Sequence, residues 1–271
     1  MKFRTLTELC AAPDYLAVTA HRGASWEYPE NTLLSMEKAV ESGADFIEFD
    51  LRASSDNIPL LLHDSVIDRT SNGTGAPETH SLSELKQYNF SFFRHGERSS
   101  EPFCSVLEIP TFEEVLKEFR GRVFMNIQIY LPNQESLREA CRLYGKYDMY
   151  DQGYMTIADP KVVEKVHSYD PEIAICLTPG WNERALPEKL ELCRKTGCRF
   201  VQPTAESVTA DTFRICRELG LRSNVFYADE PAEFVRLTKL GTNGIMTNRA
   251  EVLCAWRREN NAAGGVAGGA V

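Results

Sequence analysis

The sequence contains no long hydrophobic run. None of its 271 residues lies in a stretch approaching the ~20 apolar residues of a membrane-spanning helix. The N-terminal stretch also lacks the continuous apolar centre of a secretory signal, because polar residues and a proline interrupt it at Thr5, Thr7, Glu8, Pro13 and Asp14. We therefore expect a cytoplasmic protein without a transmembrane segment.

Basic residues are in deficit as well. The chain has 30 Lys and Arg against 39 Asp and Glu, a formal net charge of −9. This balance argues against a nucleic-acid partner held by a general basic surface, because neutralising phosphates requires clustered Lys and Arg. A small anionic substrate is compatible with it, since a metal ion or an arginine can reverse the local field inside a cleft.

Familiar metal and nucleotide motifs are absent too. The eight cysteines are scattered without a CxxC pair, and the close pair Cys193 and Cys198 has no histidine or second pair nearby. This spacing predicts buried, reduced thiols rather than a zinc site. No GxGxxG or GxxxxGK[ST] motif follows a candidate strand, which disfavours the usual phosphate-loop forms of the competing fold, an open doubly wound sheet.

What the chain does contain is a recurring unit of helix, glycine and short apolar strand. The unit occurs at residues 36–50, 190–203, 213–226 and 234–247. Each copy has one glycine placed to end the helix in a left-handed conformation: Gly43, Gly197, Gly220 and Gly241. Short apolar strands alternating with helices predict parallel strands buried on both faces.

Nine segments have the pattern of strands, and one of them is expected to pair locally or lie outside the main sheet. They are Ala17–His21, Phe46–Leu51, Pro59–His63, Val123–Ile129, Tyr154–Ile157, Ile173–Leu177, Phe200–Gln202, Ser223–Phe226 and Gly244–Thr247. Eight or nine strands with helices in ~250 residues favour an α/β fold of the (β/α)8 TIM barrel type. We predict a single barrel domain over residues 1–260.

The helix–strand alternation breaks between residues 68 and 108, after the third predicted strand. This stretch is too long for an ordinary connection and predicts an insertion over one end of the barrel, a lid or a substrate wall. Its aromatic residues Phe90, Phe92 and Phe93 either anchor the insertion on the barrel or contact a lipid or choline-like head group. The Gly/Ala-rich residues 261–271 are predicted to form a disordered tail.

Residue types that commonly take part in catalysis or metal binding lie near the ends of the first three predicted strands. His21 ends the first strand and His63 the third, while Glu48 and Asp50 are two apart in the second and point to one face. Each of these residues also has a structural explanation. His21 could be a hydrogen-bonded core histidine, and Glu48 and Asp50 could form ion pairs with neighbouring arginines. The nearby Asp64 and Asp68 could simply form turns. Their convergence at strand ends favours an active site, because barrel enzymes carry it there.

In these residues the chain resembles the glycerophosphodiester phosphodiesterase family. The matching pieces, in order, are AHRGASWEYPENT (20–32), IEFDL (47–51), LLLHD (60–64), DRTSNGTG (68–75), IPTFEEVL (109–116) and GIMTN (244–248). The resemblance implies a TIM barrel and a hydrolase that releases glycerol 3-phosphate and an alcohol with the help of Mg²⁺ or Ca²⁺. It also implies the roles of an acid/base pair for His21 and His63, a phosphate-binding residue for Arg22, and metal ligands for Glu48 and Asp50.

The chain departs from the family pattern at two places. Where the family usually reads N-I-E-I-K, this sequence has Asn126-Ile127-Gln128-Ile129-Tyr130, so Gln128 replaces a carboxylate ligand and Tyr130 a lysine. Gln128 is expected to ligate the metal through its amide oxygen and Tyr130 to reach the phosphate through its hydroxyl, with weaker metal binding. Phe226-Tyr227-Ala228-Asp229 replaces the usual W-T-V-N, so Phe226 is expected to form the wall that contacts the alcohol portion.

These departures leave three readings open. The first is an active metal-dependent phosphodiesterase. The second is a catalytically weakened or repurposed barrel that binds a phosphorylated ligand. The third is a metal-independent phosphodiesterase in which Arg22 and Tyr130 substitute for the cation. The alcohol released, the identity of the metal and the oligomeric state are left open by the sequence.

Overall fold

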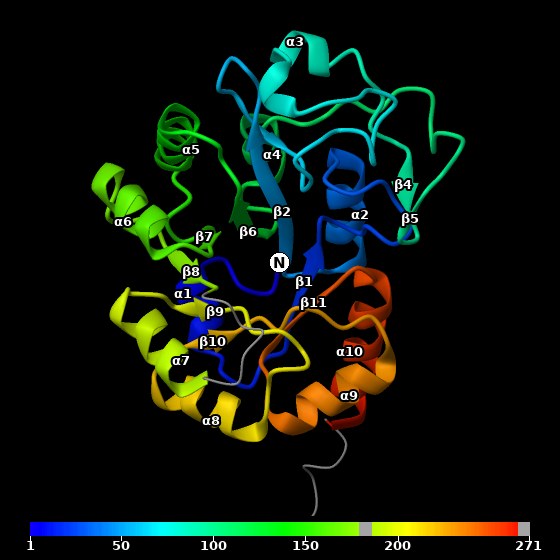
Figure 1. The fold of residues 1–271 in the computed structure, drawn as a ribbon. Helices are drawn as coiled ribbons and strands as arrows, with labels where there is room; N and C mark the ends of the chain where they lie inside the picture. The colour runs from blue at the N-terminus through cyan, green and yellow to red at the C-terminus, as the bar shows by residue number, and fades with distance from the viewer. Residues whose placement is uncertain (179–185, 265–271) are drawn as a thin grey trace, which may run out of the picture.

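Parallel strands from along the whole chain curl into a nearly closed barrel (Figure 1). The structure is a computed structural model that describes residues 1–178 and 186–264. Within them eight strands follow the order β10-β9-β8-β7-β6-β2-β1-β11, and a parallel bridge from Val225 to Ile245 joins the two ends. The strands are β1 (Ala17–His21), β2 (Phe46–Ala53), β6 (Phe124–Ile129), β7 (Gly153–Ile157), β8 (Ile175–Leu177), β9 (Phe200–Val201), β10 (Arg222–Ser223) and β11 (Gly244–Thr247). The predicted (β/α)8 barrel is confirmed.

Helices surround the barrel, as Figure 1 shows. They are α2 (Leu33–Ser42), α4 (Phe112–Phe119), α5 (Gln134–Lys146), α6 (Pro160–Tyr169), α7 (Leu186–Lys195), α8 (Ala210–Glu218), α9 (Pro231–Leu240) and α10 (Ala250–Gly264). The short α1 (Leu6–Cys10) instead contributes Leu6 and Leu9 to a core with Phe46, Phe124 and Phe200, which lie at the amino ends of their strands. This apolar plug leaves the opposite end of the barrel for polar side chains. No helix in the described ranges is both long and apolar enough to cross a membrane.

Local signals in the sequence account for the helix ends. The glycines of the repeated unit all adopt positive φ, from +69° at Gly220 to +101° at Gly241. Thr32 caps the N-terminus of α2, and Thr111 with Glu114 forms the capping box of α4. All eight cysteines are free thiols and six of them are buried, as their spacing predicts.

The third predicted strand takes a different place from the other eight. Only Pro59–Leu61 is strand (β3), and it pairs antiparallel with β2, with Leu61 opposite Leu51. A tight return from β2 explains the pairing, since β3 follows β2 directly and only a long crossover would make it parallel. His63 therefore lies in the connection after an antiparallel strand, and the prediction that it ends a barrel strand is wrong.

Residues 68–108 lie beside the carboxyl ends of β1 and β2 (Figure 1). They contain a turn of 3₁₀ helix at Pro77–Thr79, the short α3 (Leu82–Leu85) and a hairpin of β4 (Phe93–Arg94) and β5 (Glu97–Arg98). Phe90 is buried in a small core with Ile67 and Leu85. At the other end of the chain α10 continues to Gly264, into the predicted tail, and residues 265–271 lie outside the described part.

A buried ion pair fastens α10 to the barrel. The Asp45 carboxylate accepts hydrogen bonds from the Val18 amide at 2.9 Å, from the Tyr15 hydroxyl at 2.8 Å and from the Arg257 guanidinium. We expect Asp45→Ala to lower the free energy of unfolding by about 3–5 kcal/mol, because Arg257 would keep its charge without a partner. Urea unfolding followed by circular dichroism measures this loss, and Glu41→Ala, which removes an exposed ion pair with Lys38, should cost under about 1 kcal/mol. Equal effects would contradict the assignment.

Candidate active site

A small cavity of about 130 Å³ opens where the barrel strands end. It brings together all the residues that the sequence nominated for catalysis, substrate binding and metal binding, together with Gln202 and Met246. The complete lining is His21, Arg22, Glu48, Asp50, His63, Gln128, Tyr130, Gln202, Phe226 and Met246. The charged and titratable groups come from the end of β1, from β2 and from the connection after β3, whereas Gln202, Phe226 and Met246 add neutral side chains from β11 and from the connections after β9 and β10.

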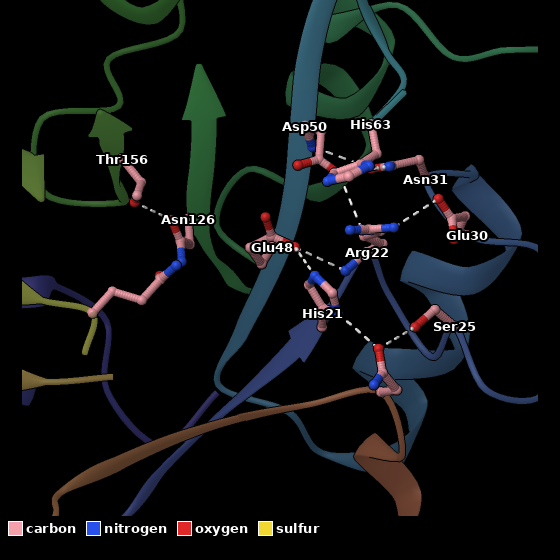
Figure 2. Close-up of polar contacts among 12 residues, drawn as sticks. His21, Arg22, Ser25, Glu30, Asn31, Glu48, Asp50, His63, Asn126 and Thr156 are labelled. Atoms are coloured by element: carbon pink, nitrogen blue, oxygen red, sulfur yellow. Dashed lines mark hydrogen bonds and ion pairs between the residues drawn. The ribbon is translucent and has the colours of Figure 1, made fainter. Parts of the chain in front are cut away.

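The HRG turn aims the first two of these residues. Arg22 has φ +56° and Gly23 φ +82°, so the chain turns sharply after β1. A Cβ on Gly23 would lie 2.7 Å from Cβ of Ser35, which is a steric clash, and only glycine avoids it because it has no Cβ. The turn directs the Arg22 amide toward Glu48 Oε2 at 3.0 Å (Figure 2).

Glu48 and Asp50 are both buried on β2, and their side chains point to the same face. Asp50 Oδ2 accepts a hydrogen bond from Asn31 Nδ2 at 2.9 Å, and Arg22 Nε lies 3.2 Å away without the alignment of a hydrogen bond. Burial raises the pKa of both carboxyl groups, and the charge of Asp50 raises that of Glu48 further. Because both pKa values are raised, additional positive charge is needed nearby for the two carboxyl groups to be ionised at the same time.

His21 is held in a defined tautomer. Its Nδ1 lies 2.7 Å from Asn248 Oδ1, and Asn248 Nδ2 donates to Asp229 Oδ2 at 2.7 Å. Because a carboxylate only accepts, Asp229 fixes the amide so that its oxygen faces His21, which must donate from Nδ1. Burial and the Arg22 charge lower the pKa of His21 to about 3. A neutral imidazole therefore presents a bare Nε2, 3.9 Å from Glu48 Oε2.

His63 has a charged partner instead. Its Nδ1 lies 2.7 Å from Asp64 Oδ1. Burial raises the pKa of Asp64, but hydrogen bonds from Arg69 and His63 outweigh it and lower that pKa to about 2. The ionised Asp64 carboxylate accepts the hydrogen bond from His63 Nδ1, whereas a neutral amide oxygen faces Nδ1 of His21.

Tyr130 closes one side of the cavity beside His63. The two rings meet edge to face with centroids 5.7 Å apart, and the Arg52 guanidinium lies 5.4 Å from the centroid of the Tyr130 ring. Burial, Asp50 and Glu48 raise the pKa of Tyr130 to about 12. The phenol consequently keeps its proton at neutral pH, so its hydroxyl is able to donate a hydrogen bond.

Sequence reasoning missed Gln202 and the Asn248–Asp229 pair. Gln202 Oε1 accepts from Asn126 Nδ2 at 2.9 Å, and its Nε2 makes no hydrogen bond with the described residues. The GIMTN motif contains Asn248 and was used only for the resemblance, while Asp229 belongs to the segment that departs from the family. Their contacts join β11 to the connection after β10, so no local spacing reveals them.

The residues present fit a hard divalent cation. Glu48 Oε1 and Asp50 Oδ1 make no hydrogen bond or ion pair with the described residues, and both groups are buried. Gln128 is opposite Asp50 in the β2–β6 register and donates through Nε2 to the Thr156 carbonyl, which leaves its Oε1 without a donor among the described residues. Three oxygens of this kind suit Mg²⁺ or Ca²⁺, although no group of three His, Cys, Asp or Glu with metal-site geometry exists in the described ranges.

A neutral imidazole, a second imidazole paired with a carboxylate, an arginine and an acidic pair lie together at the mouth of a barrel, an arrangement typical of hydrolases that act on anionic esters. The comparisons with known proteins agree. The model of the glycerophosphoryl diester phosphodiesterase family matches residues 21–252, and the chain belongs to this family. It is therefore a phosphodiesterase, an enzyme of the phosphoric diester hydrolase class.

The family relationship extends over most of the chain. A glycerophosphodiester phosphodiesterase of Bacillus subtilis is 29% identical over 88% of this chain and 85% of its own length. One from Caldanaerobacter subterraneus is 27% identical, covering 87% and 95%. Among solved structures, an Oleispira antarctica phosphodiesterase in complex with the product sn-glycerol-3-phosphate has a TM-score of 0.77 at 21% identity, covering 89% of this chain and 96% of that one.

Proposed function

We propose that this enzyme hydrolyses glycerophosphodiesters to glycerol 3-phosphate and an alcohol, assisted by Mg²⁺ or Ca²⁺ and by acid–base catalysis from His21 and His63. The observation that carries the proposal is the cavity itself, in which differently held imidazoles and Arg22 adjoin two buried carboxylates. The product bound by the Oleispira relative supports the substrate class.

The chain's own residues divide the work. The Arg22 guanidinium binds a phosphate oxygen and offsets the charge that grows in the transition state. His21 Nε2 accepts the proton of the attacking hydroxyl, the substrate's own glycerol hydroxyl or water, and His63 Nε2 gives a proton to the leaving alkoxide. Where the glycerol hydroxyl attacks, the product is a cyclic phosphate, which water then opens to glycerol 3-phosphate. Tyr130 donates a hydrogen bond to the phosphate. A cation held by Glu48, Asp50 and the Gln128 oxygen would polarise the phosphoryl group.

Hydrolysis of glycerophosphocholine and glycerophosphoethanolamine, followed by the release of glycerol 3-phosphate, tests the proposal directly. We expect turnover with Mg²⁺ or Ca²⁺ and a fall of at least about 100-fold after EDTA, because the metal supplies several kcal/mol of charge stabilisation. Activity that survives EDTA would instead support the metal-independent reading, in which Arg22 and Tyr130 replace the cation. No turnover at any concentration of either metal would contradict the proposed function.

The substitution of Gln128 for a carboxylate favours a second candidate, a barrel that binds a phosphorylated ligand without turning it over. Gln128→Glu separates the two readings. On the enzyme reading it restores a charged ligand, and we expect about 10-fold tighter binding of Mg²⁺ or Ca²⁺ by titration calorimetry. Gln202→Glu is the matched control, because it adds the same charge to another residue that lines the same cavity. Equal gains in both variants would show that Gln128 is not a ligand, and no metal binding with phosphate present would favour the binding barrel.

A further inference from the structure

The DRTSNGTG motif has no part in the reaction as described so far, yet its arginine lies between the two halves of the site. Five charged or titratable side chains form an unbroken series: Arg22, Glu30, Arg69, Asp64 and His63. Figure 2 shows the beginning of this series, where Arg22 reaches toward Glu30. The series connects the phosphate-binding arginine to the second histidine without passing through the cavity.

A single guanidinium makes both central links. Arg69 Nη1 and Nη2 donate to the two carboxylate oxygens of Glu30 at 2.9 and 2.7 Å. The same group donates from Nε and Nη2 to the two oxygens of Asp64 at 2.6 and 3.1 Å. Glu30 in turn accepts from Arg22 Nη1 at 3.0 Å. Two bidentate pairs on one rigid plane fix the mutual orientation of Glu30 and Asp64, which a lysine cannot do.

The segment 68–108 holds this guanidinium in place. The ring of Phe93, on β4, lies 4.0 Å from Arg69 Cζ. Arg98, on β5, donates to the main-chain carbonyls of Arg69 and Ser71, each at 2.9 Å. The β4–β5 hairpin therefore supports Arg69 both at its side chain, through a cation–π contact, and at its backbone.

We propose that Arg69 is a positioning residue for the hydrolase, and that the β4–β5 hairpin acts on catalysis through it. Arg69 is not among the residues that line the cavity. It orients Asp64, and through Asp64 the His63 imidazole, relative to Arg22. The expected effect of Arg69 on kcat rests on the proposed function. The hydrogen bond from His63 to Asp64 does not, because it is present whether or not a substrate is turned over.

The kinetic experiment compares wild type with Arg69→Ala and Arg69→Lys. We expect Arg69→Ala to lower kcat about 30- to 100-fold with less than a threefold change in KM, because Arg22 keeps its own contacts with Glu30 and Asp50. Arg69→Lys should recover only part of kcat. Added guanidinium should restore the alanine variant at least fivefold, since Arg69 is a quarter exposed and leaves an accessible gap. His63→Gln treated with guanidinium is the control and should gain nothing.

The second measurement is independent of turnover. The chain has only five histidines, so ¹⁵N-histidine labelling, with His63→Gln for assignment, identifies the Nδ1 proton of His63. We expect a downfield signal in wild type that is lost in Arg69→Ala, returns with guanidinium, and shifts in Phe93→Leu. An unchanged signal in Arg69→Ala would overturn the proposal, as would unchanged kcat in an active enzyme. Inactive wild type with the expected signals would refute the proposed function alone.

Discussion

His21→Gln should lower kcat by about 10³-fold while the protein remains folded, since a positioned general base contributes on the order of 10² to 10⁴. The expectation follows from the neutral state of this imidazole. Burial and Arg22 lower the pKa of His21 to about 3, so at neutral pH it has a lone pair at Nε2 and no positive charge. Glutamine matches the size of the ring and can still donate to Asn248, but it cannot accept a proton. Steady-state kcat and KM with glycerophosphocholine measure the loss.

A change of leaving group separates the two histidines. The proposed roles assign His63 to the leaving alkoxide, so a glycerophosphodiester with a nitrophenol leaving group should need little help from it. We expect the loss in His63→Gln to shrink by at least 10-fold with that substrate, whereas the loss in His21→Gln should persist. The opposite pattern would exchange the roles of the two imidazoles. Equal, undiminished losses would indicate that neither group protonates the leaving oxygen.

The part of the site that the sequence predicted is the part in which local pattern determines position. A strand has a side-chain period of two, so Glu48 and Asp50 had to share a face, and they do. The residues of β1 and β2 then meet because the strands are neighbours in register, His21 beside Glu48. The helix caps follow the same logic, since each depends on a few adjacent residues.

The parts that escaped depend on contacts that no local pattern specifies. Asp64 is a residue type common in turns, and only the arrival of Arg69, from five residues further along the chain, makes it the ionised partner of His63. In the sequence Gln202 is an ordinary polar residue at the end of a predicted strand, and closure of the barrel brings it within hydrogen-bond distance of Asn126. The antiparallel pairing of β3 with β2 could not be predicted, because the residues of a short apolar strand do not indicate whether it pairs parallel or antiparallel.

The two histidines of the site are chemically similar and differ in what holds their Nδ1 atoms. His21 faces a neutral amide oxygen and His63 an ionised carboxylate. This difference in hydrogen-bond partners supports the proposed division of roles, with His21 as the base and His63 as the acid. The asymmetry predicts that the Asn248–Asp229 pair matters to catalysis although it lies outside the cavity lining.

Asn248→Leu should therefore lower kcat by about 10²-fold or more, because an imidazole that loses the partner of Nδ1 also samples the tautomer with its proton on Nε2. Leucine is larger than asparagine but has the same branching at Cγ, and Asp229 keeps its hydrogen bonds from the Thr247 hydroxyl and the residue 248 amide, so the fold should persist. The double variant Asp229→Asn/Asn248→Asp is the sharper test. It moves the acidic group next to His21 and again provides an acceptor for Nδ1, so kcat should recover to a value above that of Asn248→Leu.

The tautomer of His21 can be measured directly. The ¹⁵N shifts of His21 should report a proton on Nδ1 in wild type and a mixture of tautomers in Asn248→Leu. A single Nδ1–H tautomer in that variant, with kcat unchanged, would show that burial alone orients the ring.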